Sequence, residues 1–169
     1  MNIRKARWDD LLQIEEIYRD AREYMKVSGN PLQWGEYYPP SDLTRSDIER
    51  ERLFVACDAE VLLAVFYFAE QEDEAYKVIR DGSWLNDAPY AVIHRMALAC
   101  GARGKGVVSQ CFDYCFSCFG NLKIDTHKDN IPMQRALEKN GFSYCGRVNV
   151  GSDHTPGDDG ERLAYQRTK

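Results

Sequence analysis

Apolar residues recur along the chain with a period of either about four or two, and these periods predict alternating helices and strands. An extended segment over 2–7 leads into a helix that should end near Ser28-Gly29. Asp10 and Gln13 have the spacing of a capping box, which would close the first turn of this helix. Its apolar face consists of Leu11, Ile14, Tyr18, Ala21 and Met25.

The following region predicts a loop, a short helix and a hairpin. Residues 29–40 combine turn formers with three aromatic side chains, so we expect an ordered loop, and a helix should follow over about 41–50. Two β-rich runs, 53–57 and 61–68, flank a polar turn and predict the hairpin. The acidic run Glu70–Glu74 marks the surface.

The centre of the chain predicts a strand, a crossover helix and a second strand. Residues 76–86 carry no clear pattern, and Trp84 there either anchors a loop or packs on a sheet. Strands are expected over 90–99 and 121–126. Because a helix separates them, they should form a βαβ unit with parallel strands and a right-handed connection. The apolar stripe of this helix comprises Val108, Cys111, Phe112, Cys115, Phe116 and Phe119.

One more helix is predicted after the βαβ unit. Asp129 or Asn130 is placed to cap it, Pro132 suits its first turn, and Gly141 suits a left-handed position at its C-terminus. Its apolar face is Met133, Ala136 and Leu137.

The end of the chain predicts a closing pair of strands, over 142–150 and 162–168. The segment 151–160 between them is polar enough to be mobile. With 169 residues, of which 44% are hydrophobic, the chain can bury a sizeable core, and we expect one domain over 1–169.

Charge and hydropathy narrow the classes of partner. No run of about 18 apolar residues is present, and the start, Met1–Arg7, leads into an amphipathic segment. We therefore expect a cytoplasmic protein that does not bind membranes. The formal charge of −5 argues against a general nucleic-acid binder and weakly favours a cationic small substrate, although Arg103 and Lys105 form a local basic patch.

Six cysteines raise the question of disulfides or a metal site. Cys111 and Cys115 lie at helical spacing among aromatic residues, which favours reduced core cysteines. A metal site built from these two and Cys118 would lack a second paired C-x-x-C motif, so we expect core packing and no metal.

The stretch Val92–Val108 is typical of a strand, a glycine turn and the start of a helix. Unpaired backbone N–H groups and the helix dipole give such a turn the capacity to bind a phosphate, although an ordinary glycine turn is the simpler alternative. Two known phosphate loops fit poorly. A Walker A loop needs Ser or Thr directly after its lysine, and Lys105 is followed by neither. A dinucleotide fingerprint needs Gly or Ala where this chain has Ser109.

The run Arg103-Gly-Lys-Gly-Val-Val108, with Asn130 and the segment Ala136–Phe142 downstream, resembles the GNAT superfamily of acetyl-CoA-dependent N-acetyltransferases. In the family motif Q/R-x-x-G-x-G/A, Arg103 takes the first position and Gly106 that of the glycine, while Val108 departs from Gly/Ala at the last. The resemblance implies the GNAT fold, an α/β (α+β) arrangement. This fold has a mixed, mostly antiparallel sheet of about seven strands, helices on both faces and a central βαβ unit.

The resemblance also implies acetyl-CoA as co-substrate and assigns residues to it. Arg103 and Lys105 would be charge partners of the pyrophosphate, and Asn130 would contact the cofactor from the opposite side. The pantetheine arm would pair with the strand end formed by Met96, Ala97 and Leu98. Backbone N–H groups would bind the pyrophosphate from Gly104, Lys105, Gly106, Val107 and Val108.

The implied reaction is direct transfer of the acetyl group to a primary amine of a small molecule or a peptide. It needs a neutral amine, a donor for the developing oxyanion and a proton source for the departing thiolate. His94 matches a position at which arylalkylamine acetyltransferases of this superfamily carry a histidine facing the acceptor, and its ordinary pKa of about 6.5 suits a base near neutrality. A core histidine bonded to a neighbouring strand is the alternative.

Many family members use a tyrosine as the general acid toward the CoA sulfur. This residue is missing here, because Leu137 stands at its position. Tyr144, Tyr90, His127 or a water would have to replace it. Packing is the alternative role for Tyr144, and capping of the next loop is the alternative for His127, which ends the second parallel strand. A protein that kept the CoA site and lost the chemistry, a CoA-binding sensor or interaction module, is the second functional hypothesis.

Three further expectations concern the neighbourhood of His94. Strand alternation should send Arg95 to the opposite face, where Asp125 is one available ion-pair partner. The aromatic residues Trp34, Tyr37 and Tyr38 either wall the acceptor pocket or pack as an ordered loop. The late strands are able to pair across a homodimer.

Overall fold

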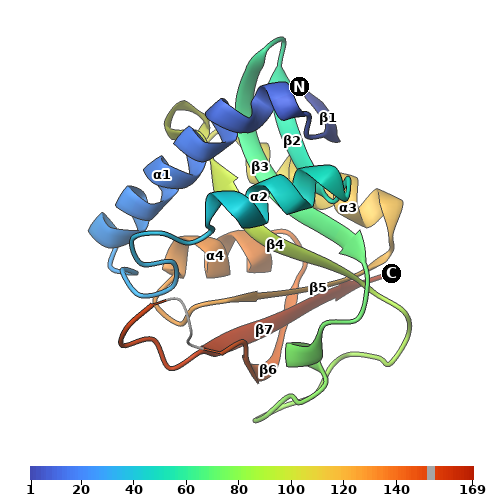
Figure 1. Cartoon of the computed structure of the whole chain (residues 1–169). Helices are drawn as coiled ribbons and strands as arrows, with labels where there is room; N and C mark the ends of the chain where they lie inside the picture. The colour runs from blue at the N-terminus through green and yellow to red at the C-terminus, as the bar shows by residue number, and fades with distance from the viewer. Residues whose placement is uncertain (152–154) are drawn as a thin grey trace.

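The computed structural model describes residues 1–151 and 155–169 and contains a single seven-stranded sheet in the order β1-β2-β3-β4-β5-β7-β6 (Figure 1). All neighbouring strands are antiparallel except β4 and β5, which are parallel. The predicted mixed, mostly antiparallel sheet with a βαβ unit is therefore confirmed. The strands are β1 (Asn2–Lys5), β2 (Leu53–Asp58), β3 (Val61–Glu70), β4 (Ala91–Leu98), β5 (Asn121–Thr126), β6 (Ser143–Asn149) and β7 (Glu161–Thr168).

Helices cover both faces of the sheet, as predicted. Helices α1 (Leu11–Val27) and α2 (Ser41–Glu49) lie on one face, and α3 (Val107–Cys118) and α4 (Ile131–Lys139) lie on the other (Figure 1). Each pair of helices packs against the strands, and a separate apolar core lies between the helices and the sheet on each face. Three short 3₁₀ turns complete the structure: η1 (Trp8–Asp10), η2 (Glu74–Tyr76) and η3 (Cys100–Ala102).

Strands β4 and β5 diverge, and this divergence opens the sheet near its centre. The two strands pair only at Ala91 with Leu122 and at Val92 with Lys123. Further along β4, the register with β3 shifts at a bulge, where Arg95 has a positive φ of 52°. Such a conformation is rare for a residue other than glycine and is held in place by the surrounding structure. The backbone of β4 beyond the bulge is consequently free of a partner on the β5 side.

The bulge overturns the expectation that His94 and Arg95 face opposite sides of the sheet. The Arg95 guanidinium lies 4.7 Å from the centroid of the Tyr67 ring, and the His94 ring lies 5.9 Å from the same ring. Both side chains therefore lie on the α1/α2 face, because one extra residue in the strand interrupts strict alternation.

The capping box predicted at the start of α1 is also wrong. The Asp10 carboxylate accepts two hydrogen bonds from Arg4, at 2.7 and 2.9 Å, and a third from the Arg7 backbone N–H. Gln13 instead contacts the β2–β3 hairpin, donating to the Glu60 carbonyl of the turn and accepting from the Leu62 N–H of β3, both at 3.1 Å. The guanidinium fork of Arg4 is a stronger partner for the carboxylate than a neutral N–H of the helix. Helix α4 is capped as expected, by the side chain of Asn130, and Pro132 lies in its first turn.

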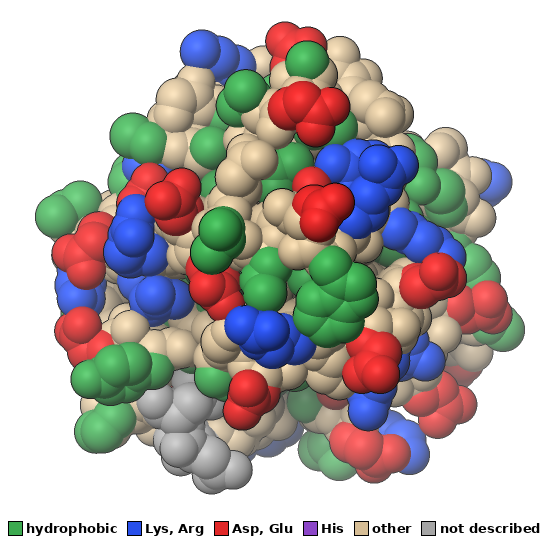
Figure 2. Space-filling view, turned by 45° about the horizontal axis from the view of Figure 1, so that its top comes forward, with side chains coloured by type: hydrophobic (Ala, Val, Ile, Leu, Met, Phe, Trp, Pro, Cys, Tyr) green, Lys and Arg blue, Asp and Glu red, His purple; other side chains and the backbone are tan. Residues whose placement is uncertain are grey.

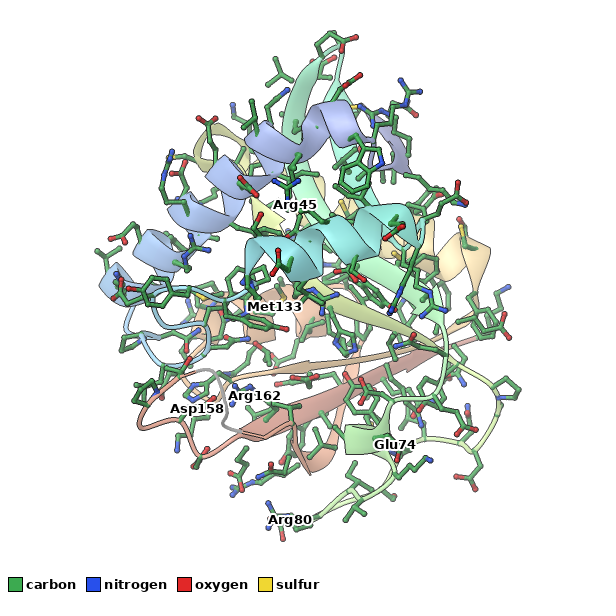
Figure 3. The ribbon with its side chains drawn as sticks, in the orientation of Figure 1. Arg45, Glu74, Arg80, Met133, Asp158 and Arg162 are labelled. Atoms are coloured by element: carbon green, nitrogen blue, oxygen red, sulfur yellow. The ribbon has the colours of Figure 1, made fainter. Side chains whose placement is uncertain are left out.

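The polar segment 151–160 was expected to be mobile, yet three of its described residues (151 and 155–160) are buried: Thr155, Asp158 and Gly160. The Thr155 and Asp158 side chains are buried, and Asp158 forms a two-pronged ion pair with Arg162 of β7 (Figure 3). Residues 152–154 lie outside the described residues. Both alternatives for Trp84 apply. Its indole N–H anchors the loop by donating to the Tyr76 carbonyl at 2.9 Å, and its ring packs on the sheet, 4.2 Å from the Lys123 Nζ of β5.

All six cysteines are free thiols, and Cys111 and Cys115 are buried in the core as expected, whereas Cys118 is exposed. Within residues 1–151 and 155–169 no cluster of three or more His, Cys, Asp or Glu side chains has a metal-binding arrangement.

None of the helices in these ranges is long and apolar enough to cross a bilayer. On the face that carries α1 and α2, acidic and basic side chains are interspersed (Figure 2).

Candidate functional site

A groove of about 310 Å³ runs along the end of β4, the turn before α3 and one side of α4. Nine of the ten residues that the family resemblance assigns to acetyl-CoA line it, and Lys105 is the exception. The nine come from three separate parts of the chain: Met96, Ala97 and Leu98 from β4; Arg103, Gly104, Gly106, Val107 and Val108 from the turn and α3; and Asn130 from the start of α4.

The turn before α3 presents free backbone donors to this groove. Gly104 and Gly106 have positive φ values of 74° and 75°, which only glycine adopts without strain. The first intrahelical bond of α3 runs from the Gln110 N–H to the Gly106 carbonyl. The N–H groups of 107–109 have no acceptor among the described residues, and the positive end of the helix dipole lies at the same place. Such a turn is suited to bind a phosphate.

Arg103 and Asn130 both line the groove, and neighbouring residues hold their side chains in place. The Arg103 guanidinium stacks on the Tyr24 ring at 4.2 Å and has no carboxylate partner among the described residues. The Asn130 side chain accepts a hydrogen bond from the Met133 N–H and donates one to Gln33 at 2.9 Å. Arg103 therefore offers a free positive charge at the groove, whereas the amide of Asn130 is already engaged in capping α4.

A second cavity, of about 440 Å³, lies on the α1/α2 face and adjoins the groove. His94, Tyr67, Asp73 and Asp125 are among the residues that line it. The two cavities meet where β4 and β5 diverge, and they share four lining residues: Met25, Met96, Asn130 and Met133 (Met133 is labelled in Figure 3). A ligand in the groove and a ligand in this cavity would therefore approach each other at the β4 bulge.

His94 lies in the second cavity between two carboxylates. Its Nε2 is 2.9 Å from an Asp73 oxygen, and its Nδ1 is 3.9 Å from an oxygen of Asp125. An ionised carboxylate can only accept, so the contact with Asp73 places the proton of neutral imidazole on Nε2 and leaves Nδ1 with its lone pair. The Asp125 oxygen also accepts from the Tyr76 hydroxyl at 2.7 Å, which fixes that carboxylate. His94 thus contacts a carboxylate that lies outside the strands, and the alternative of a core histidine bonded to a neighbouring strand does not describe it.

Sequence reasoning missed Asp73, which belongs to the acidic run Glu70–Glu74 that was assigned to the surface. Its backbone continues into η2, where its side chain accepts from the Ala75 N–H, and this turn directs the carboxylate inward to His94. Burial raises the pKa of Asp73, but its hydrogen bonds with His94 and with the Ala75 N–H outweigh this effect, and the net pKa is lowered. Asp73 is consequently ionised at neutral pH.

The ion-pair partner of Arg95 is Asp47 of α2, at 2.6 Å, and not Asp125 as expected. Both side chains of the pair are nearly buried and line the second cavity. Of the three loop aromatics, Trp34 and Tyr38 also line this cavity, whereas Tyr37 is 81% exposed and lies outside it.

Of the candidates for an acid, Tyr90 lies near the His94 cluster, because its hydroxyl accepts from the Asp73 backbone N–H at 3.1 Å, but it lines neither cavity. Tyr144 and His127 lie away from His94. Tyr144 is half exposed on the edge strand β6 and packs on Tyr165, outside both cavities. His127 is buried and accepts from the Asp129 N–H at 3.1 Å, which is the loop-capping arrangement. Burial and the nearby charge of Arg162 lower its pKa, so His127 is neutral at pH 7. Leu137 of α4 is fully buried in the core. The structure therefore groups His94 with Asp73 and Asp125, and with neither Tyr144 nor His127.

Comparisons with known proteins were made on the sequence and on the fold. The sequence model of the Acetyltransferase (GNAT) family matches residues 11–142. A search of curated protein sequences gave no significant match. Among solved structures, an acetyltransferase of the GNAT family from Streptococcus agalactiae is 29% identical, with a TM-score of 0.88 over 99% of this chain and 95% of that one.

Two more distant structures share the fold. Ribosomal-protein-alanine N-acetyltransferase from Brucella melitensis is 18% identical, with a TM-score of 0.69 over 100% of both chains. A GNAT superfamily phosphinothricin acetyltransferase from Sinorhizobium meliloti, in complex with acetyl-CoA, is 17% identical, with a TM-score of 0.65 over 98% of this chain and 86% of that one. The family match spans most of the chain and includes both the glycine turn and His94. The protein belongs to the GNAT family of acetyltransferases.

Proposed function

We propose that this protein transfers an acetyl group from acetyl-CoA to a primary amine by direct attack. The observation that carries the proposal is the junction of the two cavities at the β4 bulge, where they share Met25, Met96, Asn130 and Met133. One cavity has phosphate-binding features, and the other holds an oriented histidine. A direct transfer needs both reactants side by side, because neither the enzyme nor water carries the acetyl group between them.

The groove has the features that a coenzyme A molecule needs. The free N–H groups at the start of α3 would hold the pyrophosphate, and Arg103 would add a positive charge. Val108 departs from the family motif, but its backbone N–H is available like those of its neighbours. The end of β4, Met96–Leu98, has no strand partner on its β5 side, and there it would pair with the amide groups of the pantetheine arm. Bound acetyl-CoA supplies a thioester, whose C–S bond breaks as the amine nitrogen bonds to the acyl carbon.

His94 is the proposed base of the reaction. Its Nδ1 would take the proton that the amine must lose, either directly or through a water, and the positive charge that then forms would be stabilised by Asp73 and Asp125. Asp73 contacts the histidine and not the reacting atoms, so its role is positioning. No residue is assigned as the acid for the thiolate, because Tyr90 lines neither cavity, Tyr144 and His127 lie elsewhere, and Leu137 replaces the family's tyrosine.

The buried Leu137 favours a second candidate, a CoA-binding sensor that has lost the chemistry. Both candidates need the groove. They differ in whether an amine accelerates the release of CoA thiol from acetyl-CoA, and only the transferase predicts that it does.

The groove itself is tested by the substitution Gly106→Val. The wild-type protein should be stabilised by about 2.7 kcal/mol when acetyl-CoA is present at 100 times its Kd, because only the folded state binds it. Gly106 has a φ of 75°, so a β-branched residue would distort the turn and misplace the free N–H groups. We expect Gly106→Val to lose most of the ligand-induced shift in the thermal unfolding midpoint.

The matched control for this measurement is Gly29→Val. Gly29 is also a glycine of positive φ, but it lies at the end of α1, outside the groove. Its unfolding midpoint should fall without ligand, while its shift with acetyl-CoA stays close to that of the wild type. An absent shift in the wild-type protein, or an undiminished shift in Gly106→Val, would show that the turn does not bind the cofactor.

A further inference from the structure

Arg52 places a positive charge without a counter-ion in the wall of the second cavity. Its Nη1 donates to the Gln71 amide oxygen at 2.7 Å and to the Tyr67 hydroxyl at 3.2 Å, and these two groups are bonded to each other at 2.9 Å. Across residues 1–151 and 155–169, its Nη2 and Nε have no hydrogen-bond partner, and no carboxylate pairs with it. Neutral acceptors thus orient the guanidinium without neutralising it, and part of its donor fork stays free.

The other arginines of this cavity are paired with carboxylates, apart from one. Arg95 pairs with Asp47, and Arg162 pairs with Asp158, each at 2.6 Å. The carboxylates of Asp73 and Asp125 lie on either side of His94. The exception is Arg50, an exposed residue at the end of α2, which lines the same cavity and has no ion pair among the described residues.

The cavity is therefore bipolar, with a positive wall at Arg52 and Arg50 and a negative one around His94. Tyr67 connects the two walls, because its hydroxyl contacts Arg52 while its ring centroid lies 5.9 Å from that of His94. The free charge and the base are thus separated by about one tyrosine side chain, a span that a single small molecule can bridge.

We propose that the acceptor amine carries a carboxylate that binds Arg52 while its amino group lies at His94, so that the substrate is a free amino acid or a related small amino carboxylate. This inference rests on the proposed transfer to an amine and specifies the acceptor. A guanidinium with free donors matches a carboxylate through charge-assisted, two-pronged hydrogen bonds. A simple cationic amine would leave Arg52 unpaired in the complex, and an internal lysine of a protein carries no free carboxylate.

The test measures equilibrium binding of matched compounds to the protein saturated with CoA, which carries no acetyl group and so allows no turnover. The compounds are amino acids, from α-amino acids to longer ω-amino acids, each with its amide and its decarboxylated amine. For the amino acid that binds best, the free acid should bind at least about tenfold tighter than its amide and its decarboxylated amine, as a charge-assisted hydrogen bond predicts. Arg52→Gln should remove this preference, and Arg52→Lys should retain part of it.

Arg45→Gln is the control, because Arg45 is an exposed arginine of α2 that does not line the cavity (Figure 3). It should leave both the preference and the affinity unchanged, and all variants should keep the thermal shift with CoA. The inference is overturned if amides or decarboxylated amines bind as tightly as the acids, if Arg52→Gln keeps the preference, or if no amino carboxylate binds. Preferential binding of acids without any acetyl transfer from acetyl-CoA would instead contradict the proposed function and leave the Arg52 site standing.

Discussion

Replacing His94 with alanine should lower the turnover number for amine acetylation by at least about 100-fold at neutral pH, while acetyl-CoA affinity stays close to that of the wild type. General bases contribute about 10²- to 10⁴-fold to the rates of proton-transfer reactions. A 100-fold loss corresponds to about 2.7 kcal/mol of transition-state stabilisation. The affinity should persist because His94 lines the acceptor-side cavity and not the cofactor groove. Steady-state kinetics with saturating amine, together with acetyl-CoA titration, measure the two quantities separately.

Tyr144→Phe is the informative control for this variant. Tyr144 was a candidate from the sequence, but its exposed hydroxyl on β6 lies outside both cavities, so its removal should change the turnover number less than about twofold. A His94→Ala protein with normal turnover, or a Tyr144→Phe protein with a large loss, would mean that the proton is accepted elsewhere.

Removing the carboxylate of Asp158 should destabilise the protein by about 3–5 kcal/mol. Asp158 and Arg162 form two hydrogen bonds, at 3.0 and 2.6 Å, and their side chains are 0% and 3% exposed. Asp158→Ala would leave the guanidinium of Arg162 buried without its charge partner, and breaking a buried pair from one side typically has this cost. Urea unfolding at neutral pH measures the change in the free energy of unfolding.

The same pair gives stability a pH dependence with a definite sign. Burial raises the pKa of Asp158, but its hydrogen bonds and the charge of Arg162 outweigh this, so the net pKa lies below the ordinary value. Because the folded-state pKa is lowered, the contribution is complete above the unfolded value of about 4 and is lost as the pH falls from there through the folded pKa.

Asp159→Ala is the matched control, since the neighbouring carboxylate is 58% exposed and its ion pair with Lys128 spans 3.6 Å. Exposed pairs contribute about 0–1 kcal/mol, so this variant should be far milder. The double variant Asp158→Ala/Arg162→Met should be more stable than Asp158→Ala alone, because it removes the unpaired charge. Equal effects of Asp158→Ala and Asp159→Ala would show that the pair is not buried in solution.

The cofactor groove could be predicted from sequence because its main signals are local. Gly104 and Gly106 enforce the turn, the apolar stripe defines α3, and strand and helix follow each other directly. The order of elements was predictable for the same reason. The place of β7 between β5 and β6 was not, since it depends on pairing between distant segments.

The sequence pointed to His94, Trp34 and Tyr38 on the acceptor side, but not to its carboxylates, because these are assembled over long distances in the chain. Asp73 lies 21 residues from His94, and Asp47 lies 48 residues from Arg95. No local pattern distinguishes these carboxylates from those on the surface. The bulge at Arg95 likewise has no signal in the sequence, and it reversed the predicted direction of that side chain. The contact of Arg52 with Gln71 appears only once β2 and β3 are paired.

The most direct test of a transfer site formed by two adjoining cavities is the release of CoA thiol from acetyl-CoA, followed with and without amines of different classes. The account predicts release that depends on the amine, saturates with it and yields one N-acetylated amine per thiol, as identified by mass spectrometry of the product. Thiol release at the same rate with and without every amine, and no acetylated product, would contradict the account and favour the sensor.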